Sequence, residues 1–440
     1  MKGRIKGGVH PLKTRGEGKL STRDEAIREY IAESVTIPVA MQLGSASEPC
    51  VSVGDRVKKY QVIARASGAL GLDVHASVSG EVVDISKKHQ LSGSPLCITI
   101  KNDFEDEAEQ LDAPCGADAP PEQIIAAIKK AGICGQGGAA FPAHVKLTLR
   151  EGQHCDVIIV NGAECETFIT ADDRLMREQP GRIAAGLRAA MRAAGVERGI
   201  IAVEDNKPEA VKSLSAVAKE GIELKILKTK YPQGGEKQLI KAVTGREVGR
   251  GKLPIDSGVV VLNAGTVAAI YDAVELGIPF TERVTTVTGC VRTPSNLRLR
   301  IGTLVSDAVG ACGGYTCESP AKIVCGGGMM GIAAPSEAIS IVKATNGLVV
   351  MNEKEADLPD ETACIRCGRC VEACPMGLMP FLMRQFYEKN DIAAAVKNNV
   401  KDCILCGCCT FVCPSKRYLS ASFRHLKDSI AAMARREAGK

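Results

Sequence analysis

The chain of 440 residues and 46.4 kDa is long enough for about two to four domains, because one domain usually contains about 100–200 residues. Hydrophobic residues make up 45% and charged residues 24%, a globular composition that excludes wholesale disorder and a membrane bundle. The net charge of +5 and the aromatic content of 3% exclude a strongly basic, base-stacking nucleic-acid binder. The 19 cysteines are many for a cytoplasmic chain, so metal or redox chemistry is the first expectation.

Basic residues gather at the two ends, within residues 1–28 and from Lys416 onward. Polybasic segments suit an acidic partner or an anionic membrane surface, and the alternative is ordinary solubilising termini. No stretch approaches the roughly 20 apolar residues that a membrane-spanning helix needs. The opening MKGRIKGGVHP lacks the apolar core of a secretory signal. We therefore expect a cytoplasmic chain without a transmembrane segment of its own.

After an N-terminal arm at residues 1–30, short apolar runs with Gly-Asp and Ser-Gly turns predict a β domain at 31–103. The pattern VSVGDRVKKYQVI followed by VHASVSGEVVDI resembles the barrel-sandwich fold of biotinyl and lipoyl carriers. A carrier needs a lysine at the tip between these halves, but none occurs between Lys59 and Lys87. We expect the fold without the carrier function, followed by an acidic linker at 104–121.

Residues 122–278 alternate apolar strands with helical patterns, which predicts an α/β domain with mostly parallel strands. Ligands of such domains usually bind at the carboxyl ends of the strands. Short strands around one helical segment predict a second α+β domain at 279–354. The cysteine-rich region follows at 355–418, and the remainder, 419–440, is predicted to form a short basic helix.

The runs CIRCGRCVEACP and CILCGCCTFVCP match the pattern of two-cluster ferredoxins, in which the fourth cysteine of each run serves the other cluster. We assign one [4Fe-4S] cluster to Cys364, Cys367, Cys370 and Cys413, and the other to Cys403, Cys406, Cys409 and Cys374. Cys408 is surplus and is interpreted as a packed thiol. A pair of zinc sites would leave the third and fourth cysteine of each run unexplained. The helical pattern between the runs favours a helical version of this domain.

The segment GICGQGGAAFP, which begins at Gly132, is dense enough in glycine for backbone N–H groups to close on a phosphate. It is neither a P-loop nor the dinucleotide fingerprint, so alone it is a weak motif. Together with NGAECE, KYPQGGEKQLI, the opening GGVHP and the paired cysteine runs, it resembles the flavin subunit of respiratory complex I. It resembles more closely the C-subunit family of Rnf, the ion-pumping ferredoxin:NAD oxidoreductase. This resemblance implies an SLBB-type β-grasp fold for residues 279–354.

The resemblance also implies the cofactors, FMN and NAD(H) beside the two clusters, and the residues that bind them. The FMN residues that it implies are Gly135, Gly137, Gly138, Lys146, Asn161, Glu164, Gly234, Asn263 and Thr266. The residues implied for the nucleotide site are Phe141, Glu166, Tyr231, Glu236 and Lys252. The sequence departs from the complex I pattern at Ala140, Ala163 and Gly235, where a Gly, an Asp and a Glu are usual.

These expectations describe one reaction, because NADH gives a hydride, a [4Fe-4S] cluster takes one electron, and flavin does both. The resemblance implies an electron-transfer subunit at the cytoplasmic face of the membrane. Its expected partners are the membrane-embedded Rnf subunits, which carry the ion translocation, and the ferredoxin-like iron-sulfur subunit. The alternatives are a cobalamin reductase or soluble diaphorase subunit, and a non-catalytic iron-sulfur adaptor. A docking hypothesis is that the basic C-terminal helix contacts the membrane partners, so that deleting residues 420–440 releases the subunit.

Overall fold

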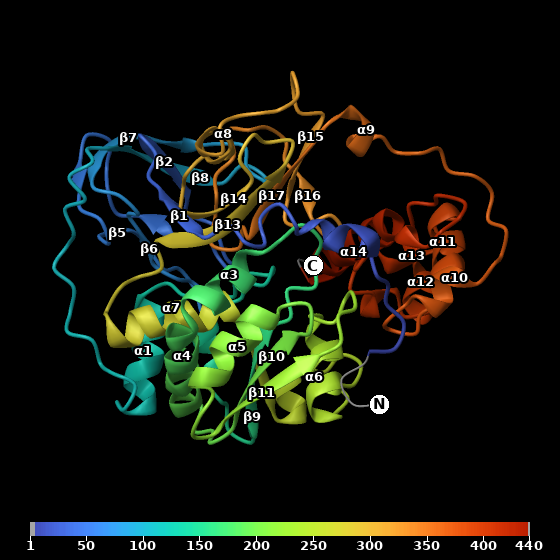
Figure 1. Ribbon diagram of the computed structural model, residues 1–440, viewed down its shortest axis with the longest axis horizontal. Coiled ribbons are helices and arrows are strands. Elements are labelled where there is room, and N and C mark those ends of the chain that lie inside the picture. Colours follow the sequence, from blue (N-terminus) through green and yellow to red (C-terminus); the bar gives the residue numbers. More distant parts are fainter. Residues whose placement is uncertain (1–4, 439–440) are drawn as a thin grey trace.

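The structure is a computed structural model that describes residues 5–438. In Figure 1 a helical α/β region lies below two β-rich regions, and a small helical region lies to one side of them. The N-terminal arm runs between these regions before the first β domain begins. Of the basic residues expected at the ends, Lys2, Arg4 and Lys440 lie outside the described residues.

The first β region consists of two small sheets, ordered β2-β8-β7-β4 and β3-β5-β6. Its core is built from β-branched residues such as Val35, Ile63 and Ile98, which suit a pleated surface. The acidic stretch that follows runs back along this domain, where Lys59 pairs with Asp106 and Lys58 with Glu107. The strands are β2 (Ser34–Pro38), β3 (Glu48–Pro49), β4 (Arg56–Val57), β5 (Val62–Arg65), β6 (Val74–His75), β7 (Gly80–Lys87) and β8 (Leu96–Asn102).

The α/β region contains a parallel four-stranded sheet in the order β11-β10-β9-β12, with helices packed on its faces. Its strands β9, β10 and β12 are buried, mainly apolar runs because both faces are covered, whereas the edge strand β11 is partly exposed. Helix α4 approaches α7 closely at Gly186, where an added Cβ would lie 1.8 Å from the Val267 carbonyl oxygen. The elements are α1 (Pro121–Lys130), α2 (Ala143–Leu147), β9 (Val157–Gly162), α3 (Ala171–Glu178), α4 (Pro180–Ala193), β10 (Gly199–Glu204), α5 (Pro208–Val217), β11 (Ile222–Leu227), α6 (Glu236–Thr244), β12 (Val259–Asn263) and α7 (Ala264–Glu275).

The third region is a six-stranded mixed sheet in the order β1-β14-β13-β17-β15-β16. Its edge strand β1 comes from the N-terminal arm and runs parallel to β14, with Ile27 opposite Asn296. The arm is therefore not a free solvated terminus beyond residue 5, because it completes a sheet. The elements are β1 (Ile27–Tyr30), β13 (Glu282–Gly289), β14 (Ser295–Arg300), α8 (Val305–Ala311), β15 (Lys322–Cys325), β16 (Ile332–Ala333), β17 (Gly347–Met351) and α9 (Glu353–Ala356).

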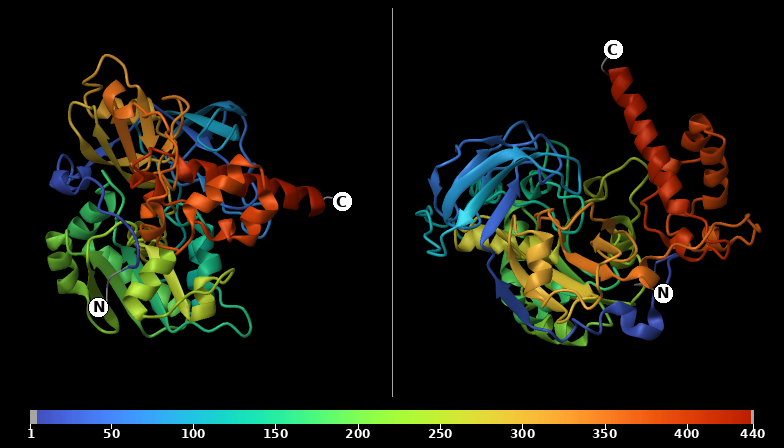
Figure 2. Two further views of the ribbon diagram at one scale, coloured as in Figure 1. Left: turned by 90° about the vertical axis from the view of Figure 1, so that its right-hand side faces the viewer. Right: turned by 90° about the horizontal axis from the view of Figure 1, so that it is seen from above.

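The fourth region is helical and contains both cysteine runs. Its last helix differs from the separate basic helix expected at 419–440, because Leu419, Phe423 and Leu426 are buried in the same core as Met383. These apolar residues recur at helical spacing, which places one face of the helix on the domain. The far end projects away from the body (Figure 2). The helices are α10 (Arg369–Glu372), α11 (Pro380–Glu388), α12 (Ile392–Lys397), α13 (Cys408–Phe411) and α14 (Leu419–Ala438).

Within residues 5–438, none of the helices combines the length and the apolar character that crossing a lipid bilayer requires.

Candidate functional site

The expected flavin residues lie at the carboxyl ends of the parallel strands. Asn161 ends β9 next to Asn263 at the end of β12, and the two are direct partners in the strand register. The Asn263 side chain accepts a hydrogen bond from Gly265 N at 2.9 Å and thus caps helix α7. The strand order therefore brings residues about 100 positions apart in sequence to one edge of the sheet, the usual ligand edge of such folds.

The glycine-rich loop lies between α1 and α2 and faces this edge. An added Cβ at Gly137 would lie 3.5 Å from the Asn263 Cβ, whereas at Gly138, with φ +136°, no atom lies within 4 Å. Gln136 N donates to Thr266 Oγ1 at 3.0 Å, which ties the loop to the first turn of α7. Ala140 has φ +48°, so it adopts the left-handed conformation that favours glycine, at the position where a Gly is usual in the complex I pattern.

Lys146 and Glu236 form an ion pair beside the glycine-rich loop. Lys146 Nζ lies 2.9 Å from Glu236 Oε1 and also donates to the Val261 carbonyl at 3.1 Å. The pair joins the helix that follows the glycine-rich loop to the start of α6. It brings together one expected FMN residue and one expected nucleotide residue.

The segment Asn161–Glu166 is held by its own side chains. Asn161 Nδ2 donates to the Gly234 carbonyl at 2.8 Å, and Gly234 N donates to Cys165 Sγ at 3.2 Å. The two Glu164 carboxylate oxygens accept from the backbone N–H groups of Asp172 and Asp173, at 2.7 and 3.1 Å. Glu164 therefore satisfies two backbone N–H groups in the first turn of α3.

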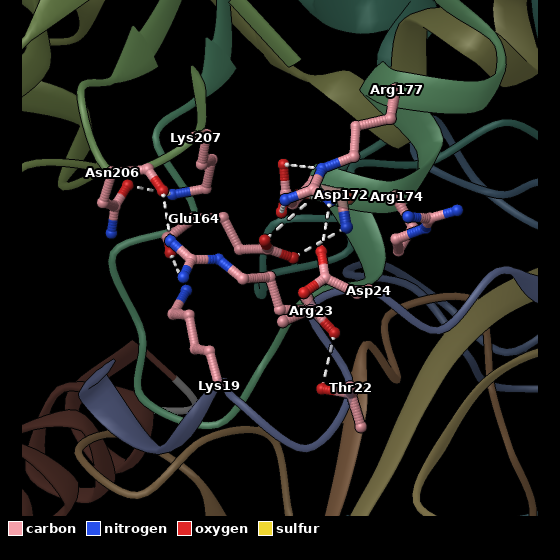
Figure 3. A network of polar contacts seen from close by, with 12 residues as sticks. Lys19, Thr22, Arg23, Asp24, Glu164, Asp172, Arg174, Arg177, Asn206 and Lys207 are labelled. Carbon is pink, nitrogen blue, oxygen red and sulfur yellow. Dashed lines mark hydrogen bonds and ion pairs between the residues drawn. The ribbon is translucent and has the colours of Figure 1, made fainter. Parts of the chain in front are cut away.

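A buried polar network surrounds this segment (Figure 3). Lys19 Nζ donates to the Glu164 carbonyl oxygen at 2.5 Å, and Lys207 Nζ donates to the Ala163 carbonyl oxygen at 2.6 Å. Burial raises the pKa of Glu164 to about 8 and lowers the pKa of Lys19. The N-terminal arm thus supplies a buried cation, Lys19, to the expected flavin segment. The interpretation of the arm as a basic terminus did not predict this contact.

The five residues expected in the nucleotide site are not linked to one another by hydrogen bonds or ion pairs within residues 5–438. Glu166 Oε1 accepts from Met329 N at 2.6 Å, so this carboxylate faces the β15–β16 loop. Tyr231 is 3% exposed and its hydroxyl donates to the Cys406 carbonyl at 2.7 Å. Phe141 is partly buried beside the glycine-rich loop, and Lys252 is exposed on the loop after α6.

Two glutamines were missed by sequence reasoning. The Gln233 side chain is completely buried, and neither its amide nitrogen nor its amide oxygen has a partner within residues 5–438. Gln136 is 4% exposed and bonds to the α7 backbone and to Arg283. Both lie inside the glycine-containing motifs, and this position is the only sign in the sequence that they belong to the site. Their burial depends on contacts that the sequence does not show.

These features fit a flavin phosphate and ring. The open space at Gly138 lets a ligand approach the backbone, and the unpaired Gln233 amide offers a donor and an acceptor to a polar ring edge. Leaving such an amide without a partner would cost about 1–3 kcal/mol.

The two cysteine sets line two separate cavities. The inner cavity is lined by Cys374, Cys403, Cys406 and Cys409, together with the surplus Cys408. The outer cavity is lined by Cys364, Cys367, Cys370 and Cys413. Each cavity thus gathers the four cysteines that the spacing predicted, three from one run and one from the other.

The lining of each cavity fits an iron-sulfur cluster, because four thiols around a cavity match the corners of a cube. The Arg417 Nε is buried and has no partner among residues 5–438, and Arg417 lines the outer cavity. Such a donor suits a cluster sulfur.

Cys408 is completely buried and packs in a cluster of side chains with Val9, Tyr231, Ala373 and Cys406. The hydrogen bond with Cys406 and then burial raise the pKa of its thiol, in agreement with a packed, neutral side chain. Cys165 packs against the same group, and burial raises its pKa to about 12. The inner cysteine set therefore adjoins the expected flavin segment through a dense contact.

Four stretches of the chain match known families. Residues 3–105 match the RnfC barrel sandwich hybrid domain, 128–272 the Nuo51 FMN-binding domain, 284–333 the SLBB domain and 363–416 the 4Fe-4S dicluster domain. These matches confirm the four-part fold expected from the sequence, and also the FMN-binding and two-cluster domains.

Two curated proteins resemble the chain over almost its whole length. It is 41% identical over 444 residues to the C subunit of the proton-translocating ferredoxin:NAD(+) oxidoreductase complex of Clostridium ljungdahlii, with 99% of this chain and 96% of that protein covered. It is 38% identical over 446 residues to the C subunit of the Na(+)-translocating ferredoxin:NAD(+) oxidoreductase complex of Acetobacterium woodii, with 99% and 98% covered.

Two solved structures of NAD+-reducing [NiFe]-hydrogenase share the fold. The H2-reduced form gives a TM-score of 0.53 at 19% identity, over 74% of this chain and 67% of that chain. The air-oxidized form gives 0.50 at 23% identity, over 64% of this chain and 55% of that chain. At these identities the likeness concerns the fold alone.

Proposed function

Because the chain belongs to the C-subunit family of ion-translocating ferredoxin:NAD(+) oxidoreductase complexes, we propose that it passes electrons between NAD(H) and the ferredoxin side of such a complex. FMN, when bound, supplies the conversion between hydride transfer and single-electron transfer. NADH gives two electrons and each [4Fe-4S] cluster takes one, so one NADH balances the two clusters, and one proton is released.

We propose that the glycine-rich loop and the strand ends hold the flavin. The residues proposed for FMN are Gly135, Gly137, Gly138, Lys146, Asn161, Glu164, Gly234, Asn263 and Thr266. Within this set Glu164 acts indirectly: its carboxylate binds the α3 backbone, and its carbonyl is held by Lys19. Gln233 is added to the set because its buried amide has no partner among residues 5–438.

For NAD(H) we propose Phe141, Glu166, Glu236 and Lys252, and we reassign Tyr231 from the nucleotide to the boundary with the inner cysteine set. For the clusters we propose the two sets of four cysteines that line the inner and outer cavities. We keep the domain limits expected from the sequence, except that the last domain extends beyond residue 418 into α14.

The observation that carries this function is the hydrogen bond from the Tyr231 hydroxyl to the Cys406 carbonyl, at 2.7 Å. Tyr231 belongs to the same turn as Gly234, which bonds Asn161 in the expected flavin segment. One short piece of chain therefore touches both the flavin residues and the inner cysteine loop. Proximity of this kind is what electron transfer between two fixed groups requires.

The test is an anaerobic titration of the purified chain, reconstituted with FMN, iron and sulfide. NADH is expected to bleach the flavin absorbance, and EPR is expected to show two reduced clusters when a stronger reductant is added. A parallel NADPH titration measures nucleotide preference. If the chain retains no flavin and NADH changes neither signal, the proposed function is wrong and the chain is an iron-sulfur adaptor that receives its electrons elsewhere.

We propose that the chain binds the membrane-embedded subunits and the ferredoxin-like iron-sulfur subunit from the cytoplasmic face of the membrane. The far end of α14 supports this, because it projects from the body and exposes Met433, Arg435 and Arg436. The deletion of residues 420–440 is a poor test, because it removes Phe423 and Leu426 from the core. Truncation after Ala432 keeps that core. It is expected to reduce membrane association in cell fractionation without changing NADH oxidation, and unchanged association would exclude α14 as the docking element.

A further inference from the structure

The opening segment Gly7–Val9 lies between the α/β region and the inner cysteine set. Gly8 N donates to the Ala373 carbonyl at 2.9 Å, next to the inner ligand Cys374. Val9 and Tyr231 exchange two backbone hydrogen bonds, with N to O distances of 2.8 and 3.0 Å. Three backbone hydrogen bonds thus connect the segment Gly7–Val9 to two regions that are more than 140 residues apart in sequence.

Both glycines are required by this geometry. Gly7 has φ +62°, and an added Cβ would lie 2.6 Å from the Cys374 carbonyl oxygen. Gly8 has φ +78°, and its Cβ would lie 2.5 Å from the Tyr231 carbonyl oxygen. Real Cβ atoms do not approach backbone oxygen so closely, so a side chain at Gly7 must displace the segment or the inner cysteine loop, and one at Gly8 must displace the segment or the Tyr231 turn.

The segment also closes a buried apolar contact. Val9 is 6% exposed and packs with Tyr231, Ala373, Cys406 and Cys408. By contrast, an ion pair across the same boundary, Arg250 with Asp402 at 3.1 Å, lies at the rim, with the arginine side chain 69% exposed. Exposed ion pairs contribute little, about 0–1 kcal/mol. The opening segment therefore fixes this boundary more firmly than the rim does.

We propose that Gly7–Val9 is a positioning element for electron transfer, which holds the inner cysteine set at a fixed place against the flavin segment. Neither glycine touches the nucleotide or supplies a cluster ligand. Their effect is on the separation between the two sites, and the rate of electron transfer between two fixed groups falls as that separation grows. This inference rests on the proposed function, in which the flavin precedes the inner cluster.

The test compares Gly8→Ala with Gly116→Ala in the full, reconstituted chain. Gly116 has φ +77°, nearly the same backbone conformation, but an added Cβ there meets no atom within 4 Å. Stopped-flow absorbance follows bleaching of the flavin by NADH, and freeze-quench EPR follows reduction of the clusters. For Gly8→Ala we expect unchanged bleaching and cluster reduction slowed severalfold, and for Gly116→Ala we expect neither step to change.

Dithionite reduction of both variants, which bypasses the flavin, shows whether the clusters are present. If Gly8→Ala loses its clusters, Val9→Ala is the milder variant, because it trims the apolar contact without a backbone clash. Arg250→Ala, which breaks only the rim contact, is the matched control across the same boundary and is expected to have no effect. Cluster reduction at the normal rate in both Gly8→Ala and Val9→Ala would overturn the proposal.

A readout without cofactors separates this inference from the proposed function. In the apo chain, hydrogen exchange of the Tyr231 amide, which donates to Val9, is expected to accelerate in Gly8→Ala and not in Gly116→Ala. If NADH bleaches no flavin in the unmodified chain, the proposed function fails, whereas unchanged exchange of the Tyr231 amide in Gly8→Ala contradicts the positioning role alone.

Discussion

The inner and outer cysteine cavities are built from the same motif and almost the same backbone. Gly368 and Gly407 stand at equivalent positions with φ +78° and +77°, and Arg366 and Leu405 both have φ +56°. A four-residue helix follows in each half, α10 and α13. The local sequence thus produces two cradles of nearly equal backbone geometry, which differ in side chains such as Arg366 in one run and Leu405 in the other.

Their surroundings differ. The outer cavity is lined by Arg366, Arg384 and Arg417, and its ligands Cys364 and Cys367 are exposed. The inner cavity has an apolar lining that includes Met383 and Phe423 from α11 and α14. Lys427 Nζ donates to the Cys403 carbonyl at 2.6 Å.

The two sites therefore differ in the side chains that surround them and not in the backbone geometry of their cradles. Reduction adds a negative charge to a cluster, and nearby positive charge and solvent favour that change, whereas an apolar enclosure opposes it. We therefore expect the outer cluster to have the higher reduction potential. Electrons that arrive at the inner site would then move energetically downhill toward the exposed one.

The largest effect is expected from removing one ligand of each set. Cys406→Ala should destroy the inner cluster and abolish reduction of the outer cluster by NADH, because the inner site is the one that adjoins the flavin segment. Cys367→Ala should destroy the outer cluster and leave the inner one reducible. EPR after NADH and after dithionite distinguishes the two. Reduction of the outer cluster by NADH at the normal rate in Cys406→Ala would contradict the role of the inner site as the one that receives electrons from the flavin.

Weaker flavin binding should reduce the transfer of electrons from NADH to both clusters equally. Thr266→Val removes the acceptor of the Gln136 N–H, and a buried donor left unpaired costs about 1–3 kcal/mol. We expect FMN affinity, measured by flavin fluorescence on dilution, to fall about tenfold, since 1.4 kcal/mol corresponds to a factor of ten. Dithionite should still reduce both clusters. A change in either cluster signal under dithionite would contradict a purely flavin-directed role.

Each charge substitution is expected to change the reduction potential of one cluster only. Arg417→Gln removes a cation from the outer cavity and is expected to lower the potential of that cluster by about 60 mV, which corresponds to a factor of ten for a one-electron couple. Lys427→Gln is the matched change at the inner site and should lower only the inner potential. EPR-monitored redox titrations measure both. If either variant shifts the reduction potentials of both clusters equally, the two environments are not independent.

The smallest effect is expected from single hydroxyl groups. Burial raises the pKa of Tyr231, so its hydroxyl stays protonated and donates to Cys406 throughout the physiological range. Tyr231→Phe should weaken the boundary by about 0.5–1.5 kcal/mol and alter the EPR signal of the inner cluster alone. Tyr418→Phe, which removes a hydroxyl bonded to Pro359 near the outer set, is the control. Thermal unfolding and EPR of both variants check this expectation.

The cysteine sets could be predicted because their information is local. Spacing within twelve residues decides which thiols share a cradle, and the exchange of fourth cysteines follows from the same pattern. The strands and helices of the α/β region follow from apolar periodicity for the same reason. Helix α3 was missed, because ADDRLMRE is short and largely charged, and its N-terminal backbone is satisfied by Glu164 from outside the helix.

The arm and α14 could not be placed from the sequence, because their contacts are long-range. In the sequence Lys19 is one more basic residue, and only the fold shows its bond to the Glu164 carbonyl, 145 residues away. The basic character of the C-terminal helix hid its apolar face of Leu419, Phe423 and Leu426. The charge of a residue can be read from the sequence alone, whereas its burial depends on contacts with residues far away in the sequence.

The contact between Gly8 and Ala373 joins two parts of the chain that are synthesised more than 360 residues apart. Domains generally fold as units during synthesis, starting from the N-terminal end. The segment Gly7–Val9 can pair with Tyr231 as soon as the α/β region has folded, but its contact with Ala373 must wait until the ribosome has completed the cysteine-rich region. A translation product that stops before this region and folds its flavin domain therefore has no inner cluster docked against it.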